Sequence, residues 1–396
     1  MSQEFKFYEF FAGGGMVRAG LGAAWNCLFA NDFDGKKGLT YQNNWGTKGE
    51  LYVGDIRDVS TGFLADTADL SWASFPCQDL SLAGVGAGLA GSRSGTFYPF
   101  WNLMTLLMSR GRGPKIIALE NVCGALTSHG GADFRTICKA FSDANYKFGA
   151  VVINASMFLP QSRSRVFFIG LRNDVSVPNY LRSPSPIEPF HTRGLKNAFA
   201  GLSPAQKTSW VWWNLPRPMM RTTTFASILE NFPSDVSWNS DQQTNALFAM
   251  MSETNQAKVE AAKCSGRIVV GGVYKRTRIE GSTRVVRAEV RFDDLAGCLR
   301  TPNGGSSRQT ILLVRGQSLR SRLLTSRETA RLMGLSDSYK LPKNYNEAYH
   351  LTGDGVAVPV VKFISANLFE PILSRDSRSA NSESMAAIDR VANFGH

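Results

Sequence analysis

The stretch of sequence that decides the fold runs from Phe5 to Trp25 and reads FKFYEFFAGGGMVRAGLGAAW. Residues 5–11 are apolar and aromatic with little alternation, as expected of a central strand that is covered on both faces. Residues 12–16 form a glycine turn, and residues 17–25 are expected to be helical. Together these pieces form the opening unit of a doubly wound α/β fold, whose turn brings the backbone close to a ligand.

The spacing of the glycine turn differs from the dinucleotide-binding pattern. Gly13 and Gly15 supply the first two glycines, but Arg18 stands where the third glycine is expected. A pyrophosphate is therefore a less favoured ligand than a smaller anionic group, such as the carboxylate of S-adenosylmethionine. A tight turn that binds no ligand is the structural alternative.

Two acidic residues stand at the ends of the next expected strands. Residues 26–31 predict a strand that ends at Asp32 and Phe33, roughly twenty residues past the glycine turn, where an acidic side chain usually reaches ribose hydroxyls. Phe33 is then placed to lie against an adenine ring. Residues 53–56 predict a short third strand, whose Asp55 would meet the adenine amino group. Each aspartate also suits a helix N-cap.

A cysteine, Cys77, stands directly after Pro76 and close behind residues 70–73, which predict a short buried strand. Proline fixes φ and lacks an N–H, so it ends the strand and directs the next side chain outward. The glycine-rich run 84–95 is typical of an active-site lid, or of a plain surface loop. This arrangement suits a nucleophile, although a lone cysteine is most often a small buried hydrophobe.

A carboxylate and two arginines join this candidate site. Residues 116–119 predict a buried strand that ends in Glu120, which would face the same crevice as Cys77, because ligand sites lie beyond the carboxyl ends of parallel strands. Arg163 and Arg165 alternate, so both point to one side of an extended segment. Paired arginines suit a carbonyl oxygen and a phosphate, and a solvated charge pair is the alternative.

The amino-acid composition changes near Pro184, where prolines become frequent and long helices are no longer expected. Basic residues accumulate from Lys263, residues 285–292 alternate like an exposed strand, and residues 301–310 are small and polar. We interpret this region as a separate domain that faces nucleic acid. The expected division is 1–184 (catalytic domain), 185–322 (target recognition), 323–374 (return to the catalytic domain) and 375–396 (polar tail).

Composition narrows the class of protein. The formal net charge of +12 favours a polyanionic partner, with nucleic acid as the leading candidate. The sequence has no apolar run of about 18 residues and no signal-peptide pattern at its start, so a cytoplasmic protein without a membrane span is expected. The six cysteines form no C-x-x-C pair and have no histidine cluster beside them, so zinc and disulfide sites are not expected.

Taken in order, these stretches resemble the C5-cytosine-specific DNA methyltransferases of bacterial and phage restriction–modification systems. The matching stretches are 11–15, 32–33, 55–56, 75–78, 120–122, 161–165, 327–328 and 353–358. The catalytic residues that the resemblance implies are Cys77, Glu120, Arg163 and Arg165. The cofactor contacts that it implies are Phe11, Ala12, Gly13, Gly15, Asp32, Phe33, Asp55, Ile56, Pro76, Asp354 and Val356. Met16 replaces a usual glycine, and Asp354 replaces the more usual asparagine.

The resemblance implies a Rossmann-like doubly wound methyltransferase domain with a smaller, irregular, mostly β target-recognition domain. It implies methyl transfer from S-adenosylmethionine to carbon 5 of a flipped-out cytosine in duplex DNA, through a covalent Cys77 adduct. A monomer at the bacterial nucleoid, beside a cognate restriction endonuclease, is expected. The alternatives are an RNA cytosine methyltransferase, a non-catalytic DNA-binding regulator and a nicotinamide-dependent oxidoreductase.

Overall fold

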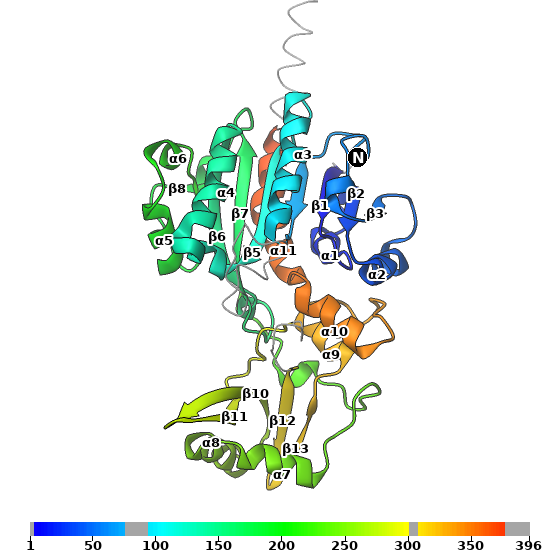
Figure 1. Cartoon of the computed structure of the whole chain (residues 1–396), viewed down its shortest axis with the longest axis vertical. Coiled ribbons are helices and arrows are strands. Elements are labelled where there is room, and N and C mark those ends of the chain that lie inside the picture. The colour runs from blue at the N-terminus through cyan, green and yellow to red at the C-terminus, as the bar shows by residue number, and fades with distance from the viewer. Residues whose placement is uncertain (1–3, 76–93, 301–307, 377–396) are drawn as a thin grey trace, which may run out of the picture.

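The computed structural model describes residues 4–75, 94–300 and 308–376 of the 396-residue chain. Two lobes stand end to end, with a seven-stranded sheet in the larger lobe and a four-stranded sheet in the smaller one (Figure 1). The larger sheet has the order β3-β2-β1-β4-β5-β7-β6. Its strands are β1 (Phe5–Phe10), β2 (Trp25–Asp32), β3 (Leu51–Val53), β4 (Leu70–Ala73), β5 (Ile116–Val122), β6 (Tyr146–Asn154) and β7 (Ser164–Arg172).

Strands β1 to β5 are parallel, and β7 is antiparallel to both of its neighbours, β5 and β6. β1 pairs with β2 on one side and with β4 on the other, so the strand order reverses between β1 and β4. Ligands of open α/β sheets bind beyond the carboxyl ends of the strands at such a switch point. The candidate residues at the ends of β1, β2 and β5 are therefore brought to one edge of the sheet.

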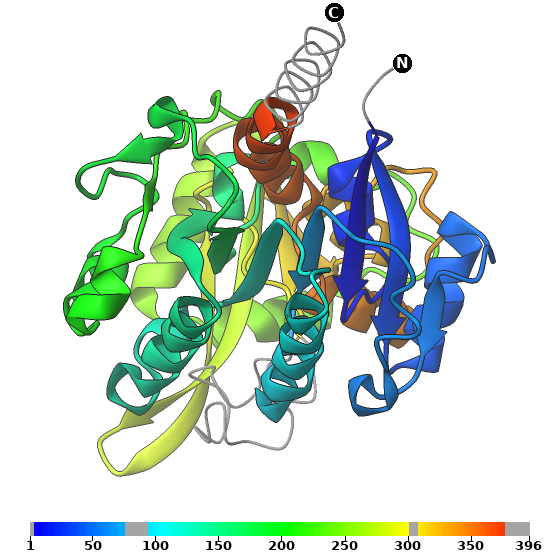
Figure 2. The same ribbon diagram turned by 90° about the horizontal axis from the view of Figure 1, so that it is seen from above.

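Helices cover both faces of the larger sheet. α3 (Phe97–Ser109) and α4 (Ala132–Asp143) lie on one face, and α11 (Val358–Ile364) lies on the other (Figures 1 and 2). Along β1, Phe5 and Phe7 enter one hydrophobic core, whereas Tyr8 and Phe10 enter the other. The prediction of a central strand that is covered on both faces is confirmed.

The first helix is shorter than predicted. α1 (Met16–Leu21) ends at the cap residue Gly22, whose φ of 77° is unfavourable for other residues, and Trp25 already belongs to β2. The third strand is also displaced: Ile56 opens the 3₁₀ turn η1 (Ile56–Asp58) instead of ending a strand. α2 (Gly35–Trp45) fills the connection between β2 and β3.

The end of the described chain returns to the larger lobe. Its elements are α9 (Ser326–Leu332), α10 (Tyr345–Asp354), α11 and the π-helical turn η10 (Ser365–Phe369). Residues 345–376 are long and apolar enough to cross a membrane by length and composition alone, but 56% of their most apolar part is buried inside the protein. The stretch behaves as a core helix, because Val361, Ile364 and Leu368 pack into the larger core.

Residues after Pro184 first pack on the larger lobe. α5 (Arg193–Ala200), α6 (Pro204–Thr208) and the short strand pair β8 (Arg182–Ser183) and β9 (Trp212–Trp213) bring Trp210 and Trp213 into the two cores. The expectation that long helices end near Pro184 was wrong, because α7 (Asp241–Ala249) and α8 (Glu253–Cys264) follow. Ser240 and Gln243 form a capping box that starts α7.

The smaller lobe has a four-stranded antiparallel sheet of order β11-β10-β12-β13. Its strands are β10 (Ile268–Glu280), β11 (Thr283–Arg291), β12 (Thr310–Arg315) and β13 (Ser318–Leu323). Leu247 and Val259 of the two preceding helices pack on Ala288, Leu312 and Val314 of the sheet in a separate core. The predicted α/β class with a smaller, largely β part is confirmed by this topology.

Candidate active site

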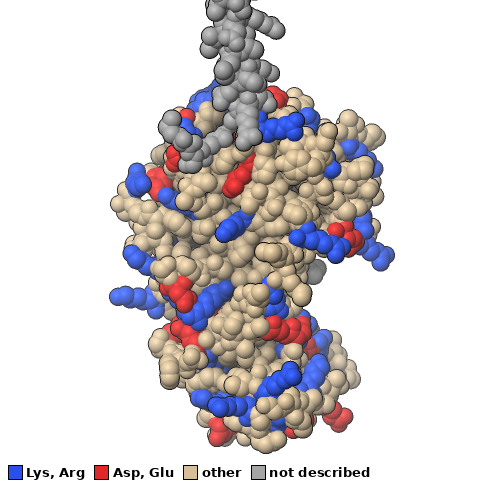
Figure 3. All heavy atoms as spheres, turned by 180° about the vertical axis from the view of Figure 1, so that it is seen from behind, with Lys and Arg blue, Asp and Glu red and all other residues tan. Residues whose placement is uncertain are grey.

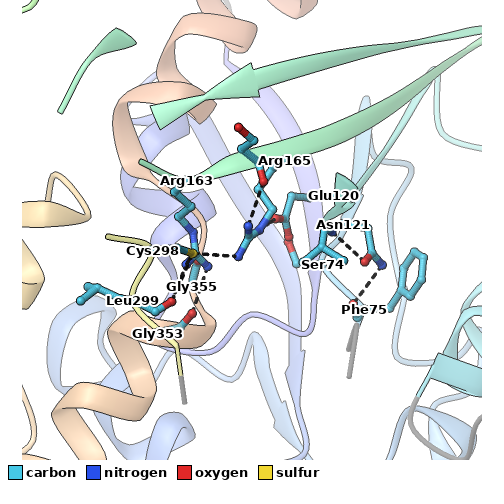
Figure 4. Close-up of polar contacts among 12 residues, drawn as sticks. Ser74, Phe75, Glu120, Asn121, Arg163, Arg165, Cys298, Leu299, Gly353 and Gly355 are labelled. Atoms are coloured by element: carbon cyan, nitrogen blue, oxygen red, sulfur yellow. Dashed lines mark hydrogen bonds and ion pairs between the residues drawn. The ribbon is translucent and has the colours of Figure 1, made fainter. Parts of the chain in front are cut away.

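A carboxylate and a guanidinium face each other at the ligand-binding edge of the larger sheet (Figure 4). Glu120 lies near the end of β5, and Arg165 lies near the start of the antiparallel β7, where it pairs with Val122. Arg165 Nε is 3.0 Å from Glu120 Oε1, and Glu120 is 7% exposed. Two strands of opposite direction thus hold an ion pair that is largely shielded from water but reaches the edge of the sheet.

The segment that follows β4 is hydrogen-bonded to β5 beside Glu120. The Asn121 side-chain amide donates a hydrogen bond of 3.4 Å to the Phe75 carbonyl, and Phe75 packs on Phe97 of α3 with 5.6 Å between ring centroids. The described chain therefore stops at Phe75, two residues before Cys77, beside the Glu120 strand. Pro76, Cys77 and residues 78–93 lie outside the described residues.

Arg163 binds two segments that lie far from it in the chain. Its Nη1 donates to the Leu299 carbonyl at 3.0 Å, and its Nη2 donates to the carbonyls of Gly353 at 3.0 Å and Gly355 at 2.6 Å (Figure 4). The side chain is 3% exposed. This guanidinium fastens the segment between the lobes and the turn after α10 to the start of β7.

Cys298 is a neighbour of both arginines that the sequence analysis did not identify. Its Sγ accepts from Arg163 Nη1 at 3.3 Å and from Arg165 Nη2 at 4.0 Å. Burial raises the pKa of the Cys298 thiol, but the guanidinium groups of Arg163 and Arg165 outweigh burial and hold this pKa below its ordinary value. No local sequence pattern indicates this contact, because Arg163 and Arg165 are separated from Cys298 by 135 and 133 positions in the chain.

The glycine turn after β1 is closed on one side and open on the other. Trp45 Nε1 and the Tyr339 hydroxyl donate to the Gly14 carbonyl at 3.0 and 2.8 Å. A methyl group added at Gly13 would meet no atom within 4 Å, and the φ of Gly13 is 55°. Gly15 has a φ of 78°, so both positions favour glycine. The Gly13 side is the part of the turn that a ligand can approach.

Asp32 lies against this open side. Its two carboxylate oxygens accept from the backbone N–H groups of Gly13 at 2.7 Å and Asp34 at 2.9 Å. Burial raises the pKa of Asp32, although Lys37 and the two backbone donors oppose that shift. Phe33 is 75% exposed at the rim. Asp34, not Asp32, caps α2.

The predicted adenine contacts lie after β3. Asp55 caps the turn η1 through Arg57 N at 2.9 Å, so it has the N-cap role that the sequence left open. The same arginine side chain holds the pKa of Asp55 below its ordinary value through a hydrogen bond. Ile56 is 3% exposed and packs in the core with the α3 side of the sheet.

The last predicted cofactor residues lie at the end of α10. Asp354 forms an ion pair with Lys37 of α2, with Nζ 2.7 Å from Oδ2, and Val356 is 4% exposed. A second pair joins Lys36 to Glu347 at 2.8 Å. Lys37 thus neutralises the carboxylate that stands in place of the more usual asparagine. Sequence analysis missed Lys37 because its partner is 317 residues away.

The chain matches known proteins over nearly its whole length. The model of the C-5 cytosine-specific DNA methylase family matches residues 5–370. The Type II methyltransferase M.HhaI of Haemophilus parahaemolyticus is 27% identical over 366 residues, which cover 92% of this chain and 94% of the relative. The Type II methyltransferase M.HpaII of Haemophilus parainfluenzae is 26% identical, with 94% and 91% covered.

Solved structures share the fold. A methyltransferase of Entamoeba histolytica, EhMeth, aligns with a TM-score of 0.57 at 13% identity and covers 93% of this chain and 99% of that one. A putative DNA modification methyltransferase encoded within an Escherichia coli prophage aligns with a TM-score of 0.55 at 18% identity, with the same coverage. The family match and the topology agree, and the chain therefore belongs to the C-5 cytosine-specific DNA methylase family and is a DNA (cytosine-5-)-methyltransferase.

Proposed function

We propose that this enzyme transfers a methyl group from S-adenosylmethionine to carbon 5 of a flipped-out cytosine in a specific duplex DNA sequence, as the modification enzyme of a restriction–modification system. The observation that carries the proposal is the Glu120–Arg165 pair, 3.0 Å apart, which stands beside the strand end that leads into Cys77. The relatives that are Type II methyltransferases support the biological setting.

The residues around the glycine turn fit this methyl donor. The open side of Gly13 leaves room for an amino-acid group beside backbone N–H groups, and the Asp32 carboxylate next to it suits a ribose diol. The exposed Phe33 ring offers a flat apolar surface for a base. When bound there, S-adenosylmethionine supplies an electrophilic methyl group on a sulfonium.

The protein must make carbon 5 of cytosine nucleophilic. The Cys77 thiolate adds to carbon 6, which moves an electron pair toward carbon 5. Glu120 holds or protonates ring nitrogen 3, so that negative charge does not accumulate on the base, and Arg165 binds the carbonyl oxygen. Carbon 5 then takes the methyl group, a base removes the carbon 5 proton, and the thiolate leaves as the ring double bond re-forms.

The DNA-binding part of the proposal rests on the smaller lobe. Base edges inside a duplex are out of reach of Cys77, so the cytosine must leave the stack. Lys275, Arg276 and Arg278 are exposed along β10, and basic side chains gather on the smaller lobe in Figure 3. We assign target recognition to residues 185–322, with the DNA contacts on β10–β13, and the catalytic domain to 1–184 and 323–374.

The cellular setting follows from the same proposal. A monomer that methylates the host sequence beside a cognate restriction endonuclease would act at the bacterial nucleoid in the cytoplasm. The polar tail 375–396 has no assigned part in catalysis. Methyl transfer to duplex DNA, compared with transfer to RNA of the same sequence, separates this function from that of an RNA cytosine methyltransferase.

Labelled-methyl incorporation into DNA tests the function. We expect the wild-type enzyme to methylate cytosine, Cys77→Ala to abolish incorporation while it still binds DNA, and Glu120→Gln to lower the rate by on the order of 10². Sequencing of bisulfite-treated DNA from expressing cells gives the target. A Glu120→Gln enzyme with the wild-type rate would show that Glu120 is structural, and full transfer by Cys77→Ala would remove the covalent step.

A further inference from the structure

We propose that Cys298 is a positioning residue of the methyltransferase reaction, whose sulfur holds the Arg165 guanidinium in the orientation that meets Glu120. The proposal rests on the proposed function, because it takes Glu120 and Arg165 as the groups that act on the base. Cys298 lies between β11 and β12, and thus belongs to the smaller lobe by its place in the chain, yet it reaches the arginines of the larger lobe (Figure 4).

The segment that carries Cys298 is fixed to the larger lobe by its backbone. Ala296 N donates to the Pro160 carbonyl at 2.8 Å, and Ser162 N donates to the Ala296 carbonyl at 2.9 Å. The Gln161 side chain accepts from Leu299 N at 3.3 Å. Contacts on both sides of Cys298 therefore define where its side chain can go, and Arg163 adds a further bond to the same segment at the Leu299 carbonyl.

Several groups share the Arg165 guanidinium. Its Nε meets Glu120 at 3.0 Å, its Nη1 donates to the Ser164 carbonyl at 2.9 Å, and its Nη2 approaches Cys298 Sγ at 4.0 Å. Arg163, which is 3% exposed, donates to the same sulfur from the other side at 3.3 Å. The sulfur is thus an acceptor that the two guanidinium groups have in common.

The electrostatics suit this role. Sulfur in the thiolate form accepts charge-assisted hydrogen bonds, and the two guanidinium groups favour that form. The thiols of Cys27 and Cys138 show the contrast: both are buried, and burial raises their pKa values. Cys298 is half-buried and lies within reach of both guanidinium groups.

The consequence is a coupling between the lobes. Residues 292–300 leave the smaller lobe after β11, and Cys298 touches the arginine that pairs with Glu120. The position of the smaller lobe when it binds DNA and the orientation of the Glu120–Arg165 pair therefore both depend on residues 292–300. Loss of the sulfur should act on the chemical step and leave the affinity for the methyl donor unchanged, because Arg163 keeps its hydrogen bonds to the Gly353 and Gly355 carbonyls, which flank Asp354.

Steady-state kinetics on full-length variants test the proposal. We expect Cys298→Ala to lower kcat about tenfold, with the KM for S-adenosylmethionine within about twofold of wild type, since one charge-assisted hydrogen bond has that worth. Cys298→Ser keeps a hydrogen-bond acceptor and should recover most of the rate. Cys264→Ala, which removes an exposed cysteine in α8, is the matched control and should behave like wild type.

A double-mutant cycle with Glu120→Gln separates positioning from a structural role. If Cys298 acts through Arg165 on Glu120, Cys298→Ala should cost almost nothing further in the Glu120→Gln enzyme. Additive losses, a wild-type kcat for Cys298→Ala, or a Ser variant as slow as the Ala variant would overturn the proposal. A Glu120→Gln enzyme with the wild-type rate would instead overturn the proposed function, so the two failures are distinguishable.

Discussion

Glu9 is a buried carboxylate in the centre of the larger lobe. It lies in β1 and is 0% exposed, and neither carboxylate oxygen has a side-chain hydrogen-bond partner among the described residues. Burial raises the pKa of Glu9 from 4.5 to about 8, against the opposing charge of Arg18. The folded protein therefore keeps Glu9 protonated at pH values where the unfolded chain has already lost that proton.

The pH dependence of stability follows from this difference. Between pH 4.5 and about 8 the folded state binds one proton more than the unfolded state, so Glu9 makes the free energy of unfolding fall as pH rises through this window. The side chain of Glu9→Gln stays neutral, so the fall in the free energy of unfolding that Glu9 causes should be absent in this variant. We expect its stability relative to wild type to grow with pH, by at most ~1.4 kcal/mol per unit.

Urea unfolding at pH 5, 7 and 8.5 measures the effect. Glu4→Gln is the control, because Glu4 is exposed next to the same strand and should leave the pH dependence unchanged. Parallel stability curves for Glu9→Gln and wild type would contradict the assignment of the buried proton to Glu9.

The sequence placed Glu120 and Arg165 in one crevice, whereas it did not identify Lys37 or Cys298. Glu120 was predicted from the end of an apolar run and Arg165 from its alternation with Arg163, and the two side chains lie 3.0 Å apart in the structure. Lys37 and Cys298 were not identified, because their partners are distant in the chain. Asp354 is 317 positions from Lys37, and the two arginines are at least 133 positions from Cys298. Local pattern carries no information about which distant segments cross at a site.

At the scale of elements, a glycine sets the contact between the first helix and the C-terminal return. Gly20 of α1 faces α11, and a Cβ on Gly20 would lie 2.5 Å from Val361 Cβ and 2.8 Å from the Val358 carbonyl oxygen. The two helices can approach this closely only because Gly20 has no side chain. Gly35, at the start of α2, would meet no atom within 4 Å.

Gly20→Ala should therefore destabilise the protein by roughly 1–3 kcal/mol, because the added methyl group overpacks the α1–α11 contact. Gly35→Ala is the matched control and should be neutral or slightly stabilising, since a helical alanine is favoured over glycine. Equal unfolding midpoints for the two single variants would show that α11 shifts freely away from α1.

The accuracy of the element predictions follows the strength of the apolar pattern. β1, β4 and β5 are apolar on both faces, so their runs were recognisable, and the alternation over 285–292 predicted β11. α8 was missed because only Val259 and Ala262 of its 12 residues are buried. A helix with so narrow an apolar stripe is defined by its packing on the smaller sheet more than by its own sequence.

At the scale of the whole molecule, the β10–β11 hairpin extends from the smaller lobe past the outline of the larger one, on the side of α3 and α4 (Figure 2). Arg276 and Arg278 project from one face of β10 and share Glu289 of β11 as an ion-pair partner. Exposed guanidinium groups held in place on a projecting ribbon suit the phosphates of the DNA duplex that is the proposed substrate.

Replacement of both arginines should weaken DNA binding about equally for cognate and unrelated sequences, because phosphate contacts carry no sequence information. The affinity falls as salt rises, and we expect Arg276→Gln/Arg278→Gln to make this fall less steep. The magnitude of the slope of log K against log salt should decrease by up to about 2, because each phosphate that the protein no longer neutralises reduces it by about one. The control is Lys6→Gln/Lys115→Gln, which removes two charges at the amino ends of β1 and β5, on the edge of the larger sheet opposite the candidate site. Fluorescence anisotropy between about 50 and 200 mM salt measures both slopes. An unchanged slope for the hairpin variant, with weaker binding to the cognate sequence only, would mean that these arginines read bases instead of phosphates.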